Sequence, residues 1–322
     1  MVARLLVSVA LLFAEFFIGA AAAQSRQGPP PEVSQIVTKD GVQLTLTYFP
    51  SAARKGSAEA KQAPPVVLLH DHKETRAVFN SLAQRLQSPG EDENNRPSFA
   101  AVTVDLRGHG DSTTRILQDS SHIDLDAARL AKQDFLAMAA YDMEAVRSFL
   151  VAKNDAGELN LNKLCLLGAG LGASVASNWA VQDWSAPPLA IGKQGQDVKA
   201  LVLISPRWSY TGLTFQAPMR FRALKEQAAW MLVYGSQDAK VRADAVRINK
   251  QLERFHTDAK KAAAGRASSL LVLPWPSKLE GSTLLKQVGE PLETKIVDFL
   301  VQQVAQRQHP WSSRLERIPL SQ

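Results

Sequence analysis

The 322-residue sequence predicts one α/β domain with a doubly wound, mostly parallel sheet. Short, continuous apolar runs recur along the chain, and such runs are typical of parallel strands that are buried on both faces. Between these runs lie stretches with apolar residues at helical spacing. The regular alternation of the two patterns favours a single doubly wound domain.

The first predicted strands form a hairpin around Asp40-Gly41, a dipeptide suited to a tight turn. Residues 35–37 and 42–49 are its two arms, and residues 28–31 and 52–65 are linkers on either side. The strands predicted after the hairpin are Val66–Leu69, Phe99–Val104, Leu164–Leu167, Ala200–Ile204, Met231–Tyr234 and Leu270–Leu273.

Helices are predicted where apolar residues recur every three or four positions. Residues 241–255 carry them at spacings of four, three, four and three, which places them on one helical face. Residues 292–300 and 141–151 show similar patterns. The polar tracts 89–98 and 260–268 are predicted to be solvent loops.

Composition excludes several classes of protein. Hydrophobic residues make up 45% of the chain and charged residues 21%, an ordinary globular balance rather than a disordered one. No interior run of 18 apolar residues occurs, which excludes a polytopic membrane protein. The net charge of +6 is mildly basic, but no basic stripe with interleaved aromatic residues indicates nucleic-acid binding.

The start of the chain has the pattern of a secretory signal peptide. Arg4 precedes an apolar run over residues 5–14, and a second apolar run after Glu15 ends in the small residues Ala21–Ala23. An uncleaved membrane anchor is the alternative. We therefore expect an exported protein, periplasmic or extracellular, organised as a signal peptide (1–23), a linker (24–32), one domain (33–305) and an irregular tail (306–322).

The single cysteine, Cys165, lies within the predicted strand 164–167. We expect it to be a small buried side chain rather than a reactive thiol. An exported chain of this sequence would then fold without an internal disulfide.

Two segments resemble a known family. Residues 102–112 read VTVDLRGHGDS after the strand-like run 66–70, and residues 166–174 read LLGAGLGAS. These strings are similar to the strand-and-turn and the strand–elbow–helix of α/β-hydrolases, especially compact esterases and dienelactone-hydrolase-like members. The resemblance covers residues 33–305 and implies the α/β-hydrolase fold. It also implies little or no lid, because residues 204–227 leave little room for one.

The resemblance places glycine where active members carry the nucleophilic serine. Aligning Gly168 and Gly172 with the outer glycines of G-x-S-x-G puts Gly170 at the nucleophile position, and no acyl-enzyme can form on glycine. Glycine relieves the backbone strain of such an elbow. Ser174 is a poor substitute, because it falls one turn into the following helix.

The acid position matches the family, whereas the base position does not. Asp238 follows the strand 231–234 in a G-x-x-D turn and matches the triad acid, although it would serve equally well as a helix N-cap. Glu280 stands at the position of the catalytic histidine. Alternatively, the two carboxylates share a proton or bind a cation such as calcium.

The oxyanion loop also departs from the family pattern. Active members have His-Gly-x here, whereas this chain has His70-Asp71-His72. His72 and Leu171 match the two residues whose N–H groups hold the oxyanion, but the carboxylate of Asp71 would oppose a developing negative charge. His70 is expected to hydrogen-bond loop backbone, as is His109. We do not expect His70 and His72 to bind zinc.

These departures together predict an exported, non-catalytic α/β-hydrolase-fold protein that acts by binding a small ligand or a protein partner. The alternative is an active hydrolase with displaced or carboxylate-based catalytic residues. No cofactor or metal is predicted. Membrane contact is expected only if the N-terminal segment stays uncleaved.

Overall fold

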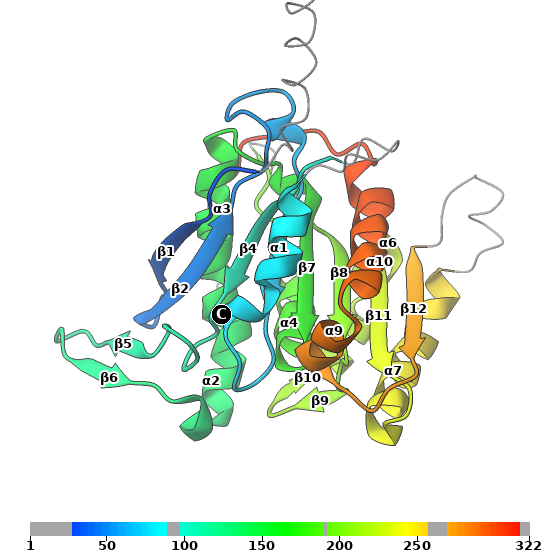
Figure 1. Cartoon of the computed structure of the whole chain (residues 1–322). Coiled ribbons are helices and arrows are strands. Elements are labelled where there is room, and N and C mark those ends of the chain that lie inside the picture. The colour runs from blue at the N-terminus through cyan, green and yellow to red at the C-terminus, as the bar shows by residue number, and fades with distance from the viewer. Residues whose placement is uncertain (1–27, 89–96, 188, 190–191, 257–268, 316–322) are drawn as a thin grey trace, which may run out of the picture.

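The computed structural model describes residues 28–88, 97–187, 189, 192–256 and 269–315. Figure 1 shows a central twisted sheet with helices on both sides. The predicted signal peptide and residues 316–322 of the predicted tail lie outside the described residues. Within them, no helix is both long enough and apolar enough to cross a membrane.

The sheet confirms the predicted fold class. Its strand order is β12-β11-β8-β7-β3-β4-β2-β5-β6, with β1 paired to β2. The six strands from β12 to β4 are all parallel, and β2 adds to them antiparallel. The strands are β1 (Glu32–Val37), β2 (Val42–Phe49), β3 (Pro65–Leu69), β4 (Ala100–Val104), β5 (Thr114–Ile116), β6 (His122–Asp124), β7 (Leu164–Ala169), β8 (Val198–Ile204), β11 (Ala229–Gly235) and β12 (Leu270–Trp275).

Helices cover both faces of this sheet. One face packs against α2, α3, α4, α6 and α7, and the other against α1, α9 and α10. The helices are α1 (Asn80–Gln87), α2 (Lys132–Ala137), α3 (Met143–Asp155), α4 (Leu171–Ser185), α5 (Gln216–Arg220), α6 (Arg222–Gln227), α7 (Ala239–Leu252), α9 (Gly281–Val288) and α10 (Glu290–Leu300).

Alternation along the strands produces the two cores. In β3, Val67 and Leu69 point to one face, whereas Val66 and Leu68 point to the other, and all four are fully buried. Cys165 of β7 is also fully buried, as the sequence predicts. A strand that is buried on both faces needs an unbroken apolar run, which is why these runs predict the sheet.

Some elements were not predicted. The strands β5 and β6 form a hairpin beyond β2, and β9 (Ser209–Tyr210) and β10 (Leu213–Thr214) form a separate two-stranded sheet after β8. These strands are two or three residues long and mostly partly exposed, so they lack the apolar run that marks a buried strand.

The motif at residues 102–112 contains two buried charged side chains, Asp105 and Arg107, which are held by polar partners. The carboxylate of Asp105 accepts hydrogen bonds from the backbone N–H groups of Arg76, at 2.6 Å, and Asp111, at 2.9 Å. The buried guanidinium of Arg107 joins Asp142 to Asp40 of the β1–β2 turn, with 2.9 Å from Nη1 to Oδ2 of Asp40. A buried charge that lacks such partners would be strongly destabilising.

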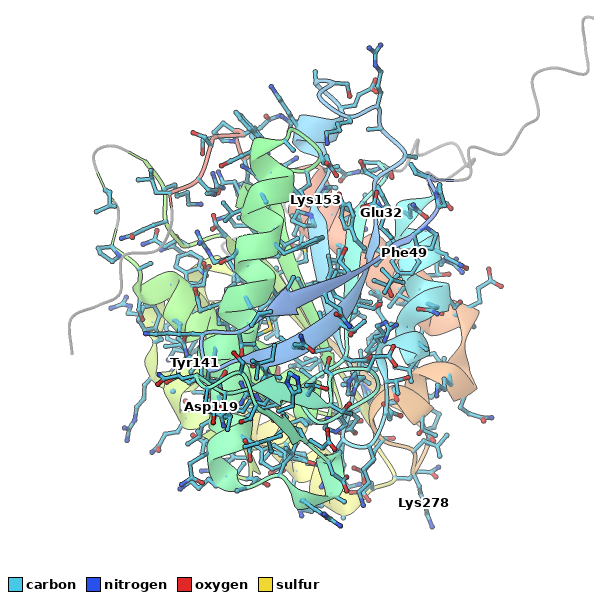
Figure 2. The ribbon with its side chains drawn as sticks, turned by 90° about the vertical axis from the view of Figure 1, so that its left-hand side faces the viewer. Glu32, Phe49, Asp119, Tyr141, Lys153 and Lys278 are labelled. Carbon is cyan, nitrogen blue, oxygen red and sulfur yellow. The ribbon has the colours of Figure 1, made fainter. Side chains whose placement is uncertain are left out.

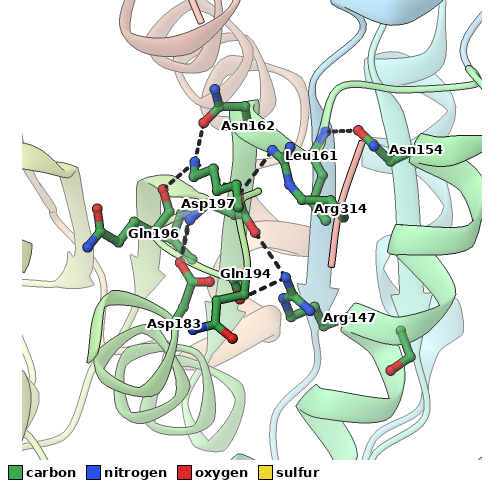
Figure 3. Close-up of polar contacts among 12 residues, drawn as sticks. Arg147, Asn154, Leu161, Asn162, Asp183, Gln194, Gln196, Asp197 and Arg314 are labelled. Atoms are coloured by element: carbon green, nitrogen blue, oxygen red, sulfur yellow. Dashed lines mark hydrogen bonds and ion pairs between the residues drawn. The ribbon is translucent and has the colours of Figure 1, made fainter. Parts of the chain in front are cut away.

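The described part of the tail, residues 306–315, is irregular and is held by buried ion pairs (Figure 3). The guanidinium of Arg314 lies 3.1 Å from Oδ1 of Asp197, and Arg147 lies 3.5 Å from the other oxygen. Lys193 adds a third cation at 3.1 Å, and its carbonyl accepts the N–H of Leu315 at 3.1 Å. Residues 306–315 are therefore part of the folded domain.

Candidate functional site

The candidate site lies at the carboxyl ends of the parallel strands. The loops after β3, β7, β8, β11 and β12 meet at this edge, because parallel strands all end on the same side of a sheet. Each residue that the sequence predicts for the site comes from one of these loops.

The turn from β7 into α4 is a sharp elbow at Gly170. Its φ of +50° and ψ of −107° lie outside the regions that residues with a Cβ prefer. A Cβ at Gly168 would lie 2.3 Å from the carbonyl carbon of Gly172, and one at Gly172 would lie 2.1 Å from the carbonyl oxygen of Leu69. The outer two glycines therefore let α4 start directly against β7 and β3.

The side chain of Asp71 occupies the space beside this elbow. A Cβ at Gly170 would meet the Asp71 carboxylate at 2.1 Å, and one at Gly281 would come within 2.4 Å of its Oδ2. Gly281 also has a positive φ, of +54°. The carboxylate thus lies between two glycines, where a nucleophilic side chain would otherwise project.

The same carboxylate engages both predicted oxyanion donors. Oδ1 of Asp71 accepts hydrogen bonds from the backbone N–H of His72, at 2.7 Å, and of Leu171, at 2.9 Å. Leu171 is the first residue of α4, and the N-terminus of a helix favours negative charge. The donor geometry of an oxyanion hole is therefore present, but a carboxylate of the chain itself occupies it.

A second acidic residue ties the Asp71 loop to α9. The carboxylate of Glu74 accepts the N–H of Asp71 at 3.1 Å, and its other oxygen accepts the hydroxyl of Ser282. Next to it, the N–H of Gly281 donates to Oγ of Ser205 at 2.9 Å. The loops after β3, β8 and β12 are thereby joined around the Asp71 carboxylate.

Asp238 caps a helix. Oδ1 accepts the N–H groups of Lys240, at 2.9 Å, and Val241, at 2.8 Å, at the first turn of α7. These are the bonds expected of an aspartate at the N-cap position. The residue follows β11 as the family's acid does, and its side chain is engaged by α7.

Glu280 has a partner that the sequence did not indicate. It precedes α9, and its carboxylate forms a close ion pair with the guanidinium of Arg207 from the loop after β8. Both side chains are about one-third exposed. Asp238 and Glu280 therefore each have polar partners of their own. No group of three or more metal-ligating side chains occurs among the described residues.

Ser174, the substitute nucleophile that the sequence offers, is buried within α4. Its hydroxyl lies 3.5 Å from the carbonyl oxygen of Gly170, one turn back along the helix. Another hydroxyl nearby, that of Ser177, also bonds to backbone carbonyls of α4. Neither side chain projects from the elbow.

The histidines beside Asp71 bond to the loop backbone and to each other. Nε2 of buried His70 accepts the N–H of Leu106 at 3.0 Å, so Nδ1 carries the proton and donates to the carbonyl of Asp71. Burial lowers the pKa of His70 to about 4. Burial also lowers the pKa of His109 and of His72, whose rings meet with 3.3 Å between Nε2 and Nδ1.

The proton positions in this histidine cluster follow from its partners. Nδ1 of His109 lies 2.9 Å from the carbonyl oxygen of Arg107, which can only accept. His109 therefore donates through Nδ1, and its Nε2 accepts from Nδ1 of His72. The three neutral imidazole rings pack against one another beside the Asp71 loop. The ring of His72 also contacts the aromatic rings of Phe135 and Tyr210.

Comparison with known proteins supports the fold. A model of the alpha/beta hydrolase family matches residues 66–318. An esterase from Pyrococcus furiosus is similar in structure, with a TM-score of 0.51, 12% identity, and coverage of 85% of this chain and 91% of that one. A peroxisomal alpha-beta-hydrolase from Saccharomyces cerevisiae gives a TM-score of 0.50 and 13% identity over 90% and 93% of the two chains.

An acylaminoacyl peptidase from Pyrococcus horikoshii covers 94% of this chain but only 45% of its own length, with a TM-score of 0.50 and 13% identity. A search of curated protein sequences finds no significant match. The fold and the elbow thus define an α/β-hydrolase-type protein. This chain belongs to the alpha/beta hydrolase family.

Proposed function

We propose that this protein is an exported, non-catalytic member of the alpha/beta hydrolase family, and that it acts by binding a ligand or a protein partner. The position of the Asp71 carboxylate is the observation that carries the proposal. It takes the two N–H groups at the oxyanion positions, and it fills the space beside Gly170.

Acyl transfer of the serine type needs three things that this site does not combine. The nucleophile position is glycine, which has no attacking atom. The base position is Glu280, which is ion-paired with Arg207. The oxyanion donors are occupied by Asp71, and a substrate oxyanion would have to displace a carboxylate of like charge.

A fluorophosphonate probe and p-nitrophenyl acetate test the proposal together. We expect no labelled serine, and hydrolysis no faster than with heat-denatured protein. Labelling of any serine would contradict the proposal, as would turnover that survives Ser174→Ala. If turnover falls in Glu280→Gln or Asp238→Asn, the alternative, a carboxylate-based hydrolase, replaces it.

Export is tested separately from catalysis. The small residues Ala21–Ala23 end the apolar N-terminal segment, so the mature chain is expected to begin at or near Gln24. Intact-mass measurement of protein recovered from the periplasm or medium checks this. A mature chain that still contains Arg4 would contradict cleavage.

A further inference from the structure

The helix α7 carries a row of positively charged side chains on the face that points away from the sheet. Its apolar face, with Val241, Ala245 and Ile248, is buried against β11 and β12 (Figure 1). On the outer face, residues at spacings of three and four form one row along α7 and the short turn after it. The row consists of Lys240, Ala243, Arg247, Lys250 and Arg254, all of which are exposed. It spans about 21 Å and contains no acidic residue.

The cations of this row have no acidic partners. None of the four forms an ion pair with a carboxylate among the residues that the structure describes. The acidic residues nearest in the helix, Asp244 and Glu253, lie beside the row, and Glu253 instead accepts the side-chain amide of Asn249 at 3.3 Å. Elsewhere on the surface, cations are paired: Lys153 lies next to Glu32 in Figure 2, with 3.0 Å between Nζ and Oε2.

The helix gains little stability from the row. Lys240 stands in the first turn of α7, where the helix dipole disfavours positive charge. Arg247 and Lys250 are three positions apart, and like charges at this spacing destabilise a helix. Only Lys250, in the last turn, complements the dipole. A row of charges that costs helix stability favours a role in binding.

Two of the cations are held in place by aromatic rings. The guanidinium carbon of Arg247 lies 3.6 Å from the ring centroid of Trp208, in the loop after β8. Arg254 lies over the ring of Phe255 at 4.9 Å. Stacking of this kind fixes the plane of a guanidinium and leaves its N–H edge for carboxylates. Held cations also lose less conformational entropy when they bind.

The shape of the row favours a narrow anionic partner over a broad anionic surface. Helical spacing places Asp244 on one side of the row and Glu253 on the other, so the positive charge follows a narrow line. A membrane would bring its anionic headgroups against these two carboxylates as well. The apolar face of α7 is buried against the sheet and does not reach lipid.

We propose that this row binds an acidic helical segment of a protein partner. A helix that lies alongside α7 has the same repeat, so its glutamate or aspartate residues at spacings of three and four oppose the cations in turn. The inference rests on the proposed function, since it names the chemistry of the partner that a non-catalytic protein binds.

Fluorescence anisotropy with a synthetic peptide tests the proposal. The probe is an alanine-based helical peptide of about 18 residues with glutamate at spacings of three and four, and a scrambled peptide of the same composition is its control. We expect saturable binding of the probe, weakened at least about tenfold when NaCl rises from about 50 to about 500 mM. The scrambled peptide is expected to bind at least about tenfold more weakly. Equal binding of the two peptides, or no binding, would overturn the proposal.

Charge-neutral variants test whether the row is responsible. Lys240→Gln/Arg247→Gln/Lys250→Gln/Arg254→Gln changes exposed side chains, so it is expected to fold and to bind the probe at least about tenfold more weakly. The matched control removes four exposed cations from other faces: Lys39→Gln/Arg54→Gln/Lys286→Gln/Lys295→Gln. It is expected to change the dissociation constant by less than about twofold. Equal losses in the two variants would mean that net charge alone decides binding, and would overturn the proposal.

Other anionic partners are tested in the same assay. Vesicles of phosphatidylcholine with phosphatidylglycerol, and a single-stranded oligonucleotide, are both expected to bind more weakly than the acidic peptide. Tighter binding of either one, lost in the row variant, would overturn the assignment to a protein partner. Labelling of a serine by the fluorophosphonate probe bears only on the absence of catalysis, so that failure is distinct from a failure of peptide binding.

Discussion

Replacing Gly170 by serine would place a side chain at the predicted nucleophile position of the elbow. We expect this change to lower the free energy of unfolding. The new Cβ would lie 2.1 Å from the Asp71 carboxylate, a distance at which one of the two must move. The backbone at φ +50° and ψ −107° is also strained for any residue with a Cβ.

The backbone strain and the overlap with Asp71 together give the expected loss in the free energy of unfolding. Backbone strain of this kind costs about 1–3 kcal/mol, and overpacking a filled site costs about 1–3 kcal/mol more. We therefore expect Gly170→Ser to lower the free energy of unfolding by about 2–6 kcal/mol. In an Asp71→Gly background the overlap disappears, and the added cost of serine falls to about 1–3 kcal/mol. The double-mutant cycle thus has a coupling energy of about 1–3 kcal/mol.

Urea unfolding followed by tryptophan fluorescence measures the free energies of all four proteins in the cycle. Gly56→Ser serves as the matched control, because Gly56 also has a positive φ, of +79°, but a Cβ there would meet nothing within 4 Å. Costs of Gly170→Ser and Asp71→Gly that simply add would show that the Asp71 carboxylate does not fill the space beside Gly170.

Three further predictions follow from buried groups. Arg314→Met should lower the free energy of unfolding by about 3 kcal/mol, because it breaks the fully buried ion pair with Asp197. The control Arg129→Met removes an exposed ion pair and should cost less than about 1 kcal/mol. Chemical denaturation of the two variants measures both losses. Burial raises the pKa of the Cys165 thiol and keeps reagents in solution away from it, so the native protein should react with iodoacetamide only after unfolding. Rapid alkylation of the native protein would show that the strand is not buried. The pKa of His70 is lowered from 6.5 to about 4, so the unfolded chain binds a proton between these values and the folded chain does not. Stability should therefore fall by about 3 kcal/mol from this group as the pH drops from 6.5 to 4, and His70→Gln should remove that part of the slope in denaturation measured across this range.

The sequence by itself determined the class of the fold and the buried strands of the central sheet. The unbroken apolar run that includes Cys165 had to be a strand buried on both faces, because a half-exposed strand would alternate. The glycines at 168, 170 and 172 predicted the sharp turn between β7 and α4, because only a residue without a Cβ fits where the chain passes this close to its neighbours. Asp238 was recognisable as a helix cap, because a cap acts on the residues that directly follow it.

Tertiary structure decided which side chains of separate loops form hydrogen bonds and ion pairs with one another. Asp71 and Leu171 are 100 residues apart, and only the packing of β3 beside β7 brings the carboxylate within hydrogen-bond distance of the Leu171 N–H. Glu280 and Arg207 are likewise joined by loops after different strands. Local sequence patterns predict which side chains are buried, because burial repeats every two residues in a strand and every three or four residues in a helix. The partner of a charge depends on which strand ends lie side by side, and this is settled only when the sheet has formed.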